Sequence, residues 1–196
     1  MSKPTNTKIL EEALILFTEK GYIDTTMNDI AKRVGIKAPS IYEHYSSKKE
    51  LFFDVLEFCF SKYKNMLENV CEGLQYPVDM SELFKIYKKV IHFMIKNNYN
   101  YKFFLRYITF PPNQFEDVIR ERIFNLTKFS AKAIISIYEG LITNEMIKVI
   151  NKTDFVLWFY RMIIGDIFQF IICNEKLNDE KLTNNWELFW SGIYKN

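Results

Sequence analysis

Basic and hydroxyl side chains gather between Thr25 and Leu51, and they are the residues whose types and spacing could do chemistry. The basic ones are Lys32, Arg33, Lys37, Lys48 and Lys49. Cations this close together attract phosphate groups, even in a chain whose net charge is only +2. We therefore expect this segment to form a local positive patch that binds the phosphates of a nucleic acid.

Patterns that carry catalysis or metal binding are missing from the sequence. There is no glycine-rich phosphate loop and no nucleophile elbow. The two histidines and three cysteines show no metal-ligand spacing. The sequence therefore predicts no catalytic residues, no bound metal and no cofactor.

Composition indicates a soluble globular protein. The chain has 196 residues, of which 48% are hydrophobic and 26% charged, so wholesale disorder is excluded. The N-terminus has no apolar signal segment, and the most apolar stretch, residues 155–173, contains Arg161 and Asp166. We expect a cytoplasmic protein without a membrane span.

Helical spacing of apolar residues predicts an all-α fold of about nine helices. The expected ranges are 7–20, 26–33, 37–43, 48–73, 79–97, 100–109, 112–141, 153–174 and 180–194. The first 50 residues hold only four of the 33 aromatic residues. This break predicts a small head over 1–50, extending to about residue 60 along a long helix, and a larger helical body over 51–196.

Two short helices joined through Gly35 give the head the pattern of a helix-turn-helix. Thr26 and Asp29 form a capping box at the start of the first helix, and Pro39 falls in the first turn of the second. Ile30, Val34 and Ile41 are spaced to pack inward. The second helix would then face outward and could enter a DNA major groove.

The head resembles the DNA-binding domain of TetR-family transcriptional regulators. The matching residues are Gly21, Thr25–Thr26, Ile30–Ala31, Gly35–Ile36, Ser40–Ile41–Tyr42, His44–Tyr45, and Ser47–Lys48 with Leu51. The match covers about 45 residues in one register. Beyond residue 60 the resemblance is limited to length, helix number and aromatic content.

The resemblance implies a role for each matching residue of the head. Thr25 and Thr26 would open the second helix, with Thr26 binding a phosphate through its hydroxyl and backbone N–H. Base edges would be contacted by Lys37, Ala38, Pro39 and Ser40. Phosphates would be bound by Tyr42, His44 and Lys48, while Tyr45 would close the core of the head.

The last two helices of the body are apolar on most of their surface, which favours burial against a partner. The resemblance also implies a homodimer formed through these helices. The expected interface residues are Phe155, Trp158, Phe159, Met162, Trp186, Phe189 and Trp190. A single large core without a dimer is the alternative.

Polar groups set among the aromatic residues of the body suggest a small-molecule site. The candidate residues are Phe58, His92, Phe104, Tyr107, Glu139, Arg161, Asp166 and Gln169. The aromatic residues could equally be core packing. Arg161 and Asp166 lie about 140° apart around one helix, so they could pair across the dimer or face a ligand.

We expect a ligand-responsive transcriptional regulator, most simply a repressor, that binds a near-palindromic double-stranded DNA operator as a homodimer. A small, largely apolar effector in the ligand-binding and dimerisation domain (51–196) would release it. The alternative is a helical small-molecule carrier or enzyme that keeps a head unable to read DNA.

Overall fold

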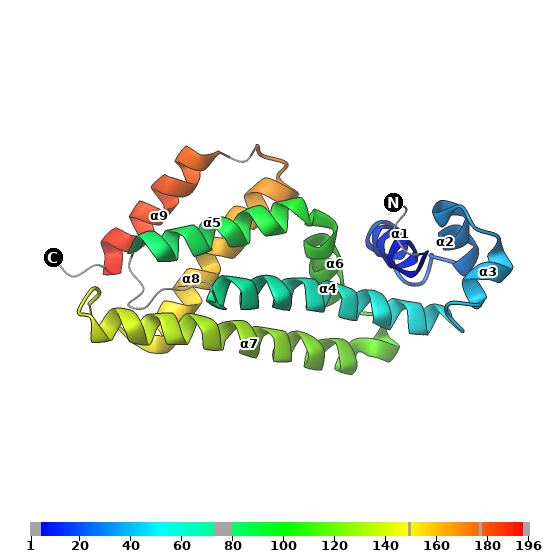
Figure 1. Cartoon of the computed structure of the whole chain (residues 1–196), viewed down its shortest axis with the longest axis horizontal. Coiled ribbons are helices and arrows are strands. Elements are labelled where there is room, and N and C mark those ends of the chain that lie inside the picture. The colour runs from blue at the N-terminus through cyan, green and yellow to red at the C-terminus, as the bar shows by residue number, and fades with distance from the viewer. Residues whose placement is uncertain (1–4, 73–79, 149, 177, 194–196) are drawn as a thin grey trace. The chain divides into compact units, whose positions relative to one another are not determined.

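The computed structural model describes residues 5–72, 80–148, 150–176 and 178–193, and these residues contain helices and no extended strand (Figure 1). The α-helices are α1 (Thr5–Glu19), α2 (Met27–Val34), α3 (Ala38–Tyr42), α4 (Lys48–Glu72), α5 (Met80–Lys96), α6 (Asn98–Thr109), α7 (Glu116–Thr143), α8 (Lys152–Ile167) and α9 (Asp179–Ile193). A 3₁₀ turn, Asn113–Phe115, precedes α7, and α8 continues as a π-helical turn, Phe168–Ile172. The predicted all-α fold of about nine helices is confirmed.

The predicted helix ends differ from the observed ones by at most two residues, with two exceptions. The helix expected from 112 begins as an α-helix only at Glu116, because the 3₁₀ turn intervenes. The helix expected to end at 174 leaves α geometry after Ile167. The predicted ends at 73, 79 and 194 lie outside the described residues.

The chain divides into two compact units, and the division differs from the boundary predicted near residue 50. The first unit contains the chain as far as Tyr63 together with Tyr99–Phe124. The second contains Lys64–Asn98 and the chain from Asn125 onward. Helix α6 and the start of α7 therefore pack with the head, although they are remote from it in sequence.

Phe52 of α4 lies at the centre of the first unit. Its ring contacts Phe17 of α1 at a centroid distance of 5.4 Å and Tyr107 of α6 at 4.9 Å. It also packs against Tyr22, Phe103 and Phe115. This cluster explains why α6 joins the head: one fully buried ring needs partners from three separate parts of the chain.

The second unit has its own aromatic core, made by α5, α7, α8 and α9. Trp186 of α9 stacks on Tyr87 of α5 at 5.7 Å and on Trp190 at 5.7 Å. Phe155 of α8 packs against Tyr138 of α7. Many of the aromatic residues that raised the expectation of a ligand site are thus core packing.

One segment of the described chain, Lys152–Ile172, is long and apolar enough to cross a membrane by length and composition alone. A core helix of a soluble protein has the same properties, and Phe155, Phe159 and Ile163 of this segment are buried inside the second unit.

Candidate nucleic-acid interface

The α2–α3 pair has the geometry of a helix-turn-helix. Thr26 and Asp29 form the predicted capping box, with 3.1 Å bonds in both directions. Gly35 ends α2 with φ +83°, a left-handed conformation that glycine adopts without strain. Ile30 and Ile41 are fully buried, so the sequence pattern correctly identified the inward face.

Helix α3 turns a polar face outward. Lys37, Pro39 and His44 are exposed, and 54% of the Tyr42 side chain is accessible. Ala38 and Ser40 are half-buried. A nucleic acid could therefore reach the residues expected at base edges and the two expected phosphate ligands Tyr42 and His44. Tyr45 is buried, as expected for the residue that closes the head.

Thr26 keeps only one of the two donors expected to bind a phosphate. Its backbone N–H donates to the Asp29 carboxylate, so that group is already used within the capping box. Its hydroxyl oxygen accepts from the Asp29 backbone N–H, which leaves the hydroxyl hydrogen available. The hydroxyl is exposed at the N-terminus of α2, where the helix dipole favours an anion.

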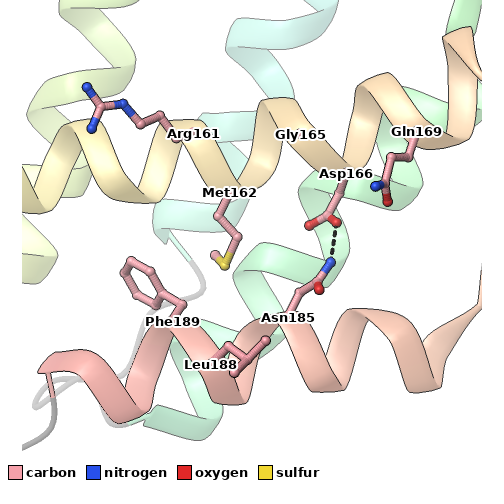
Figure 2. A pocket seen from close by; sticks show the side chains of 8 residues that line it. All are labelled: Arg161, Met162, Gly165, Asp166, Gln169, Asn185, Leu188 and Phe189. Carbon is pink, nitrogen blue, oxygen red and sulfur yellow. Dashed lines mark hydrogen bonds between the residues drawn. The ribbon is translucent and has the colours of Figure 1, made fainter.

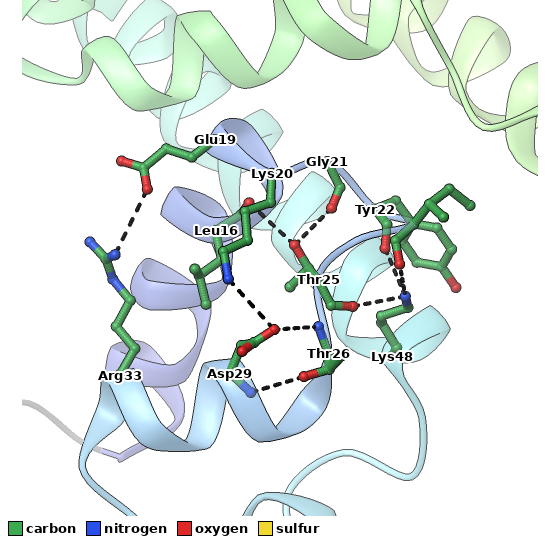
Figure 3. Close-up of polar contacts among 11 residues, drawn as sticks. Leu16, Glu19, Lys20, Gly21, Tyr22, Thr25, Thr26, Asp29, Arg33 and Lys48 are labelled. Atoms are coloured by element: carbon green, nitrogen blue, oxygen red, sulfur yellow. Dashed lines mark hydrogen bonds and ion pairs between the residues drawn. The ribbon is translucent and has the colours of Figure 1, made fainter.

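Thr25, expected at the interface, is instead completely buried. Its hydroxyl donates to the Gly21 carbonyl at 2.7 Å and lies 3.3 Å from the Leu16 carbonyl (Figure 3). A side chain enclosed in this way cannot reach DNA. Thr25 therefore closes the turn between α1 and α2, and the expectation of a DNA contact is wrong.

Lys48, expected to bind a phosphate, is also turned inward. Its ammonium group donates to the carbonyls of Tyr22 at 2.7 Å, Ile23 at 3.0 Å and Thr25 at 2.8 Å (Figure 3). It also lies 4.6 Å from the centre of the Tyr22 ring. An ammonium group has three hydrogens, and all three are used. Lys48 fastens α4 to the α1–α2 turn, which sequence spacing could not reveal.

The positive patch is smaller than the sequence suggested. Arg33 binds Glu12 at 2.5 Å, and Lys48 binds the carbonyls just described, so both cations serve the interior of the head. Three lysines of the segment stay exposed toward solvent: Lys32, Lys37 and Lys49. These three can still attract phosphates.

The eight residues expected to bind a small molecule do not come together. Phe58, Phe104 and Tyr107 belong to the first unit, and the Tyr107 hydroxyl donates to the Phe17 carbonyl at 3.0 Å. His92 and Glu139 are exposed, and Glu139 pairs with Lys152 at 3.6 Å. These five residues do not form one site.

The other three, Arg161, Asp166 and Gln169, do share a groove between α8 and α9. The groove encloses about 360 Å³ and is also lined by Met162, Gly165, Asn185, Leu188 and Phe189 (Figure 2). Asp166 is 3% exposed, accepts from the Tyr87 hydroxyl, and accepts from Asn185 Nδ2 at 2.6 Å. Burial raises the pKa of this carboxyl group, against the opposing effect of the two hydrogen bonds.

The residues expected at a dimer interface are divided between two environments. Phe155, Phe159, Trp186 and Trp190 are buried within one chain, so they are not available to a partner. Met162 and Phe189 are half-buried in the groove. Trp158 is 48% exposed, and it belongs to a set of exposed apolar side chains that we call the α8–α9 face: Leu157, Trp158, Ile164, Phe168, Ile172 and Leu188.

Fold and interface together define the class of the protein, an all-α regulator with a DNA-binding helix-turn-helix. Residues 9–55 match the family model for bacterial regulatory proteins of the tetR family. The biofilm operon icaADBC negative transcriptional regulator IcaR of Staphylococcus aureus (strain Newman) is 30% identical over 132 residues, or 67% of this chain and 68% of IcaR. The chain belongs to the tetR family and is a transcriptional regulator.

Solved structures with the same fold cover almost the whole chain. A Clostridium perfringens protein described as a fatty acid metabolism regulator has a TM-score of 0.75 at 19% identity, over 96% of this chain and 100% of that chain. The ketosteroid regulator KstR2 of Mycobacterium tuberculosis has a TM-score of 0.72 at 18% identity, over 100% of this chain and 98% of that chain. The IcaR alignment is also longer than the head, so sequence similarity continues past residue 60.

Proposed function

We propose that this protein is a ligand-responsive transcriptional repressor that binds a near-palindromic operator as a homodimer in the cytoplasm. The outward polar face of α3, held by the caps of the helix-turn-helix, is the observation that carries the proposal. The similarity to IcaR, which is named as a negative regulator, supports repression.

The contacts to DNA follow from which side chains are exposed. Lys37 can donate to guanine O6 and N7, and Ala38 and Pro39 can contact a thymine methyl group. The hydroxyls of Thr26 and Tyr42, with His44, are placed for phosphates at the groove edge. Two copies of α3 would enter successive major grooves about 34–36 Å apart.

The α8–α9 face supports the homodimer. Six large apolar side chains, each at least 39% exposed, follow the outer side of α8 and α9. A contiguous apolar surface of this kind marks an association site. Gly165 lies in the same region of α8, and a methyl group there would meet no atom within 4 Å. The protomer's own packing does not require this glycine, whereas the close approach of a partner helix would.

A small, largely apolar effector would release the operator by favouring a head spacing that fits it poorly. Couplings of this kind are typically about 1–3 kcal/mol. The names of the two solved relatives make long-chain fatty acids and ketosteroids the first probes to try. The groove lined by Arg161, Met162 and Phe189 is one candidate site, although it adjoins the α8–α9 face.

The test is to select duplexes from a random pool with the purified protein at about 150 mM salt, where non-specific binding is weak. We expect an inverted repeat. Lys37→Ala and Tyr42→Phe should each reduce affinity for it, while Lys62→Ala, on α4 beyond the head, should not. If the protein binds no duplex even at low salt, the proposal fails and the carrier with a non-reading head takes its place.

A further inference from the structure

The C-terminal end of α1 is bound by side chains from α6, eighty or more residues away in sequence. Arg106 Nη1 donates to the Thr18 carbonyl at 3.2 Å, and Nη2 donates to the Lys20 carbonyl at 3.3 Å. The neighbouring Tyr107 hydroxyl donates to the Phe17 carbonyl at 3.0 Å. These contacts satisfy the carbonyls that a helix leaves without partners at its C-terminus.

A second contact joins the other end of α6 to the same turn of α1. The Tyr99 hydroxyl donates to Glu19 Oε1 at 2.8 Å, and Glu19 in turn lies 3.8 Å from Arg33 of α2. Tyr99, Arg106 and Tyr107 are spaced by seven and eight residues, so they lie on one side of α6. We call these three side chains and their bonds to α1 the clamp.

Electrostatics favours a cation at this position. The C-terminus of a helix carries a partial negative charge, and α1 has no basic residue in its own last turn. Arg106 supplies that cation from α6. Gly21 makes room for it: a Cβ atom there would lie 3.1 Å from Arg106 Cζ. Arg106 therefore lies directly on the left-handed turn, φ +89°, that ends α1.

We propose that Arg106 is a positioning residue for operator binding: through the clamp it holds the head against α6, so that α1–α3 and α6 move as one body. The division of the chain supports this, because α6 belongs to the same compact unit as the head. Any movement of α6 then reaches the recognition helix through α1 as well as through α4. The proposal rests on the proposed operator binding and adds a residue that does not touch DNA.

Spacing selectivity of the operator tests the proposal. One base pair inserted at the centre of the selected inverted repeat rotates one half-site by about 34° relative to the other. The unmutated protein should bind the native spacing more tightly. Arg106→Ala loosens the head, so the ratio of the two affinities should fall by about threefold or more. Arg106→Lys should restore part of the ratio.

The matched control is Arg120→Ala, which removes the same charge from an exposed pair with Glu116 on α7. It should leave the ratio unchanged. If Arg106→Ala weakens binding to both spacings equally, Arg106 only stabilises the fold and the positioning role is overturned.

A readout without DNA separates this inference from the proposed function. Hydrogen exchange at the Lys20 and Gly21 amides, which bond the Leu16 and Phe17 carbonyls, should be faster in Arg106→Ala than in Arg120→Ala. Equal exchange in the two variants would overturn the clamp. An absence of any selected repeat from the unmutated protein would instead contradict operator binding and leave the exchange result to decide the clamp.

Discussion

Lys48 donates a hydrogen bond of 2.8 Å to the carbonyl of Thr25, across 23 residues of sequence. With the bonds to Tyr22 and Ile23, it ties the first turn of α4 to the α1–α2 turn. The first residue available to a phosphate after this turn is Thr26. Lys48 thus influences DNA binding by holding the start of α2 in place.

Lys48→Met should therefore lower stability rather than remove a phosphate contact. Hydrogen bonds to a charged group contribute about 1.5–3 kcal/mol, so thermal or urea unfolding should show a loss of about 2 kcal/mol. The salt dependence of operator binding distinguishes the two roles. Its slope should stay constant in Lys48→Met and fall by about 0.9 in Lys37→Met. A fall of that size for Lys48→Met would show that the lysine does reach a phosphate.

Thr25 and Tyr42 should behave in opposite ways. Thr25→Val removes a buried hydroxyl and leaves the Gly21 carbonyl without that donor, so we expect a loss of about 1 kcal/mol in unfolding free energy. The affinity of the folded protein for its operator should not change. Tyr42→Phe removes an exposed hydroxyl that has no hydrogen bond within the described residues, so it should reduce operator affinity without changing stability.

The sequence was sufficient for the helices of the head because their ends are determined locally. Thr26, Asp29 and Gly35 act within one turn of themselves, and the structure places all three as expected. The inward faces of Lys48 and Thr25 depend on carbonyls brought close by folding. No local pattern distinguishes such a lysine from one that faces a phosphate.

The dimer residues show a second limit of the sequence. Helix α8 is apolar around most of its circumference, so periodicity could not tell which side faces the chain's own core. The structure buries Phe155 and Phe159 and exposes Leu157, Trp158 and Ile164. The partners of α8 within the second unit, α5 and α9, decide between these sides, and they are specified by tertiary packing.

The α8–α9 face predicts which substitution should dissociate the dimer. Trp158→Glu should weaken self-association by about 30-fold or more, since a central interface residue contributes about 2 kcal/mol. Sedimentation equilibrium measures this directly. Phe110→Glu, at a residue 77% exposed in the first unit, is the matched control and should leave the dimer intact. Equal effects of the two substitutions would mean that the face is not the interface.

Asp166 predicts a specific pH dependence of stability. Burial raises the pKa of its carboxyl group above the value in the unfolded chain. Between these two pKa values the folded state binds more protons, so the contribution of Asp166 to stability falls as pH rises through that window. Arg161 and Lys181 are the nearby cations, and Lys181 acts to lower the pKa. The difference in unfolding free energy between the unmutated protein and Asp166→Asn should show this slope.

Substitution at Asp166 also tests its hydrogen bonds. An asparagine can accept from Asn185 and donate to the Tyr87 oxygen, so Asp166→Asn should change stability at pH 7 by less than about 1 kcal/mol. Asp166→Ala leaves both partners unpaired in a buried site and should cost about 2 kcal/mol or more. A slope that persists in Asp166→Asn would assign the pH dependence to another group.

Gly21 and Arg106 should be coupled energetically. Gly21→Ala forces a left-handed conformation on a residue with a Cβ, which costs about 1–2 kcal/mol, and it also displaces the Arg106 guanidinium. In the Arg106→Ala background only the backbone cost remains, so the two losses should add to less than their sum. Residues in contact typically show about 0.5–3 kcal/mol of such coupling. Strict additivity in urea unfolding would mean that the guanidinium moves aside freely and that the clamp contributes nothing at Gly21.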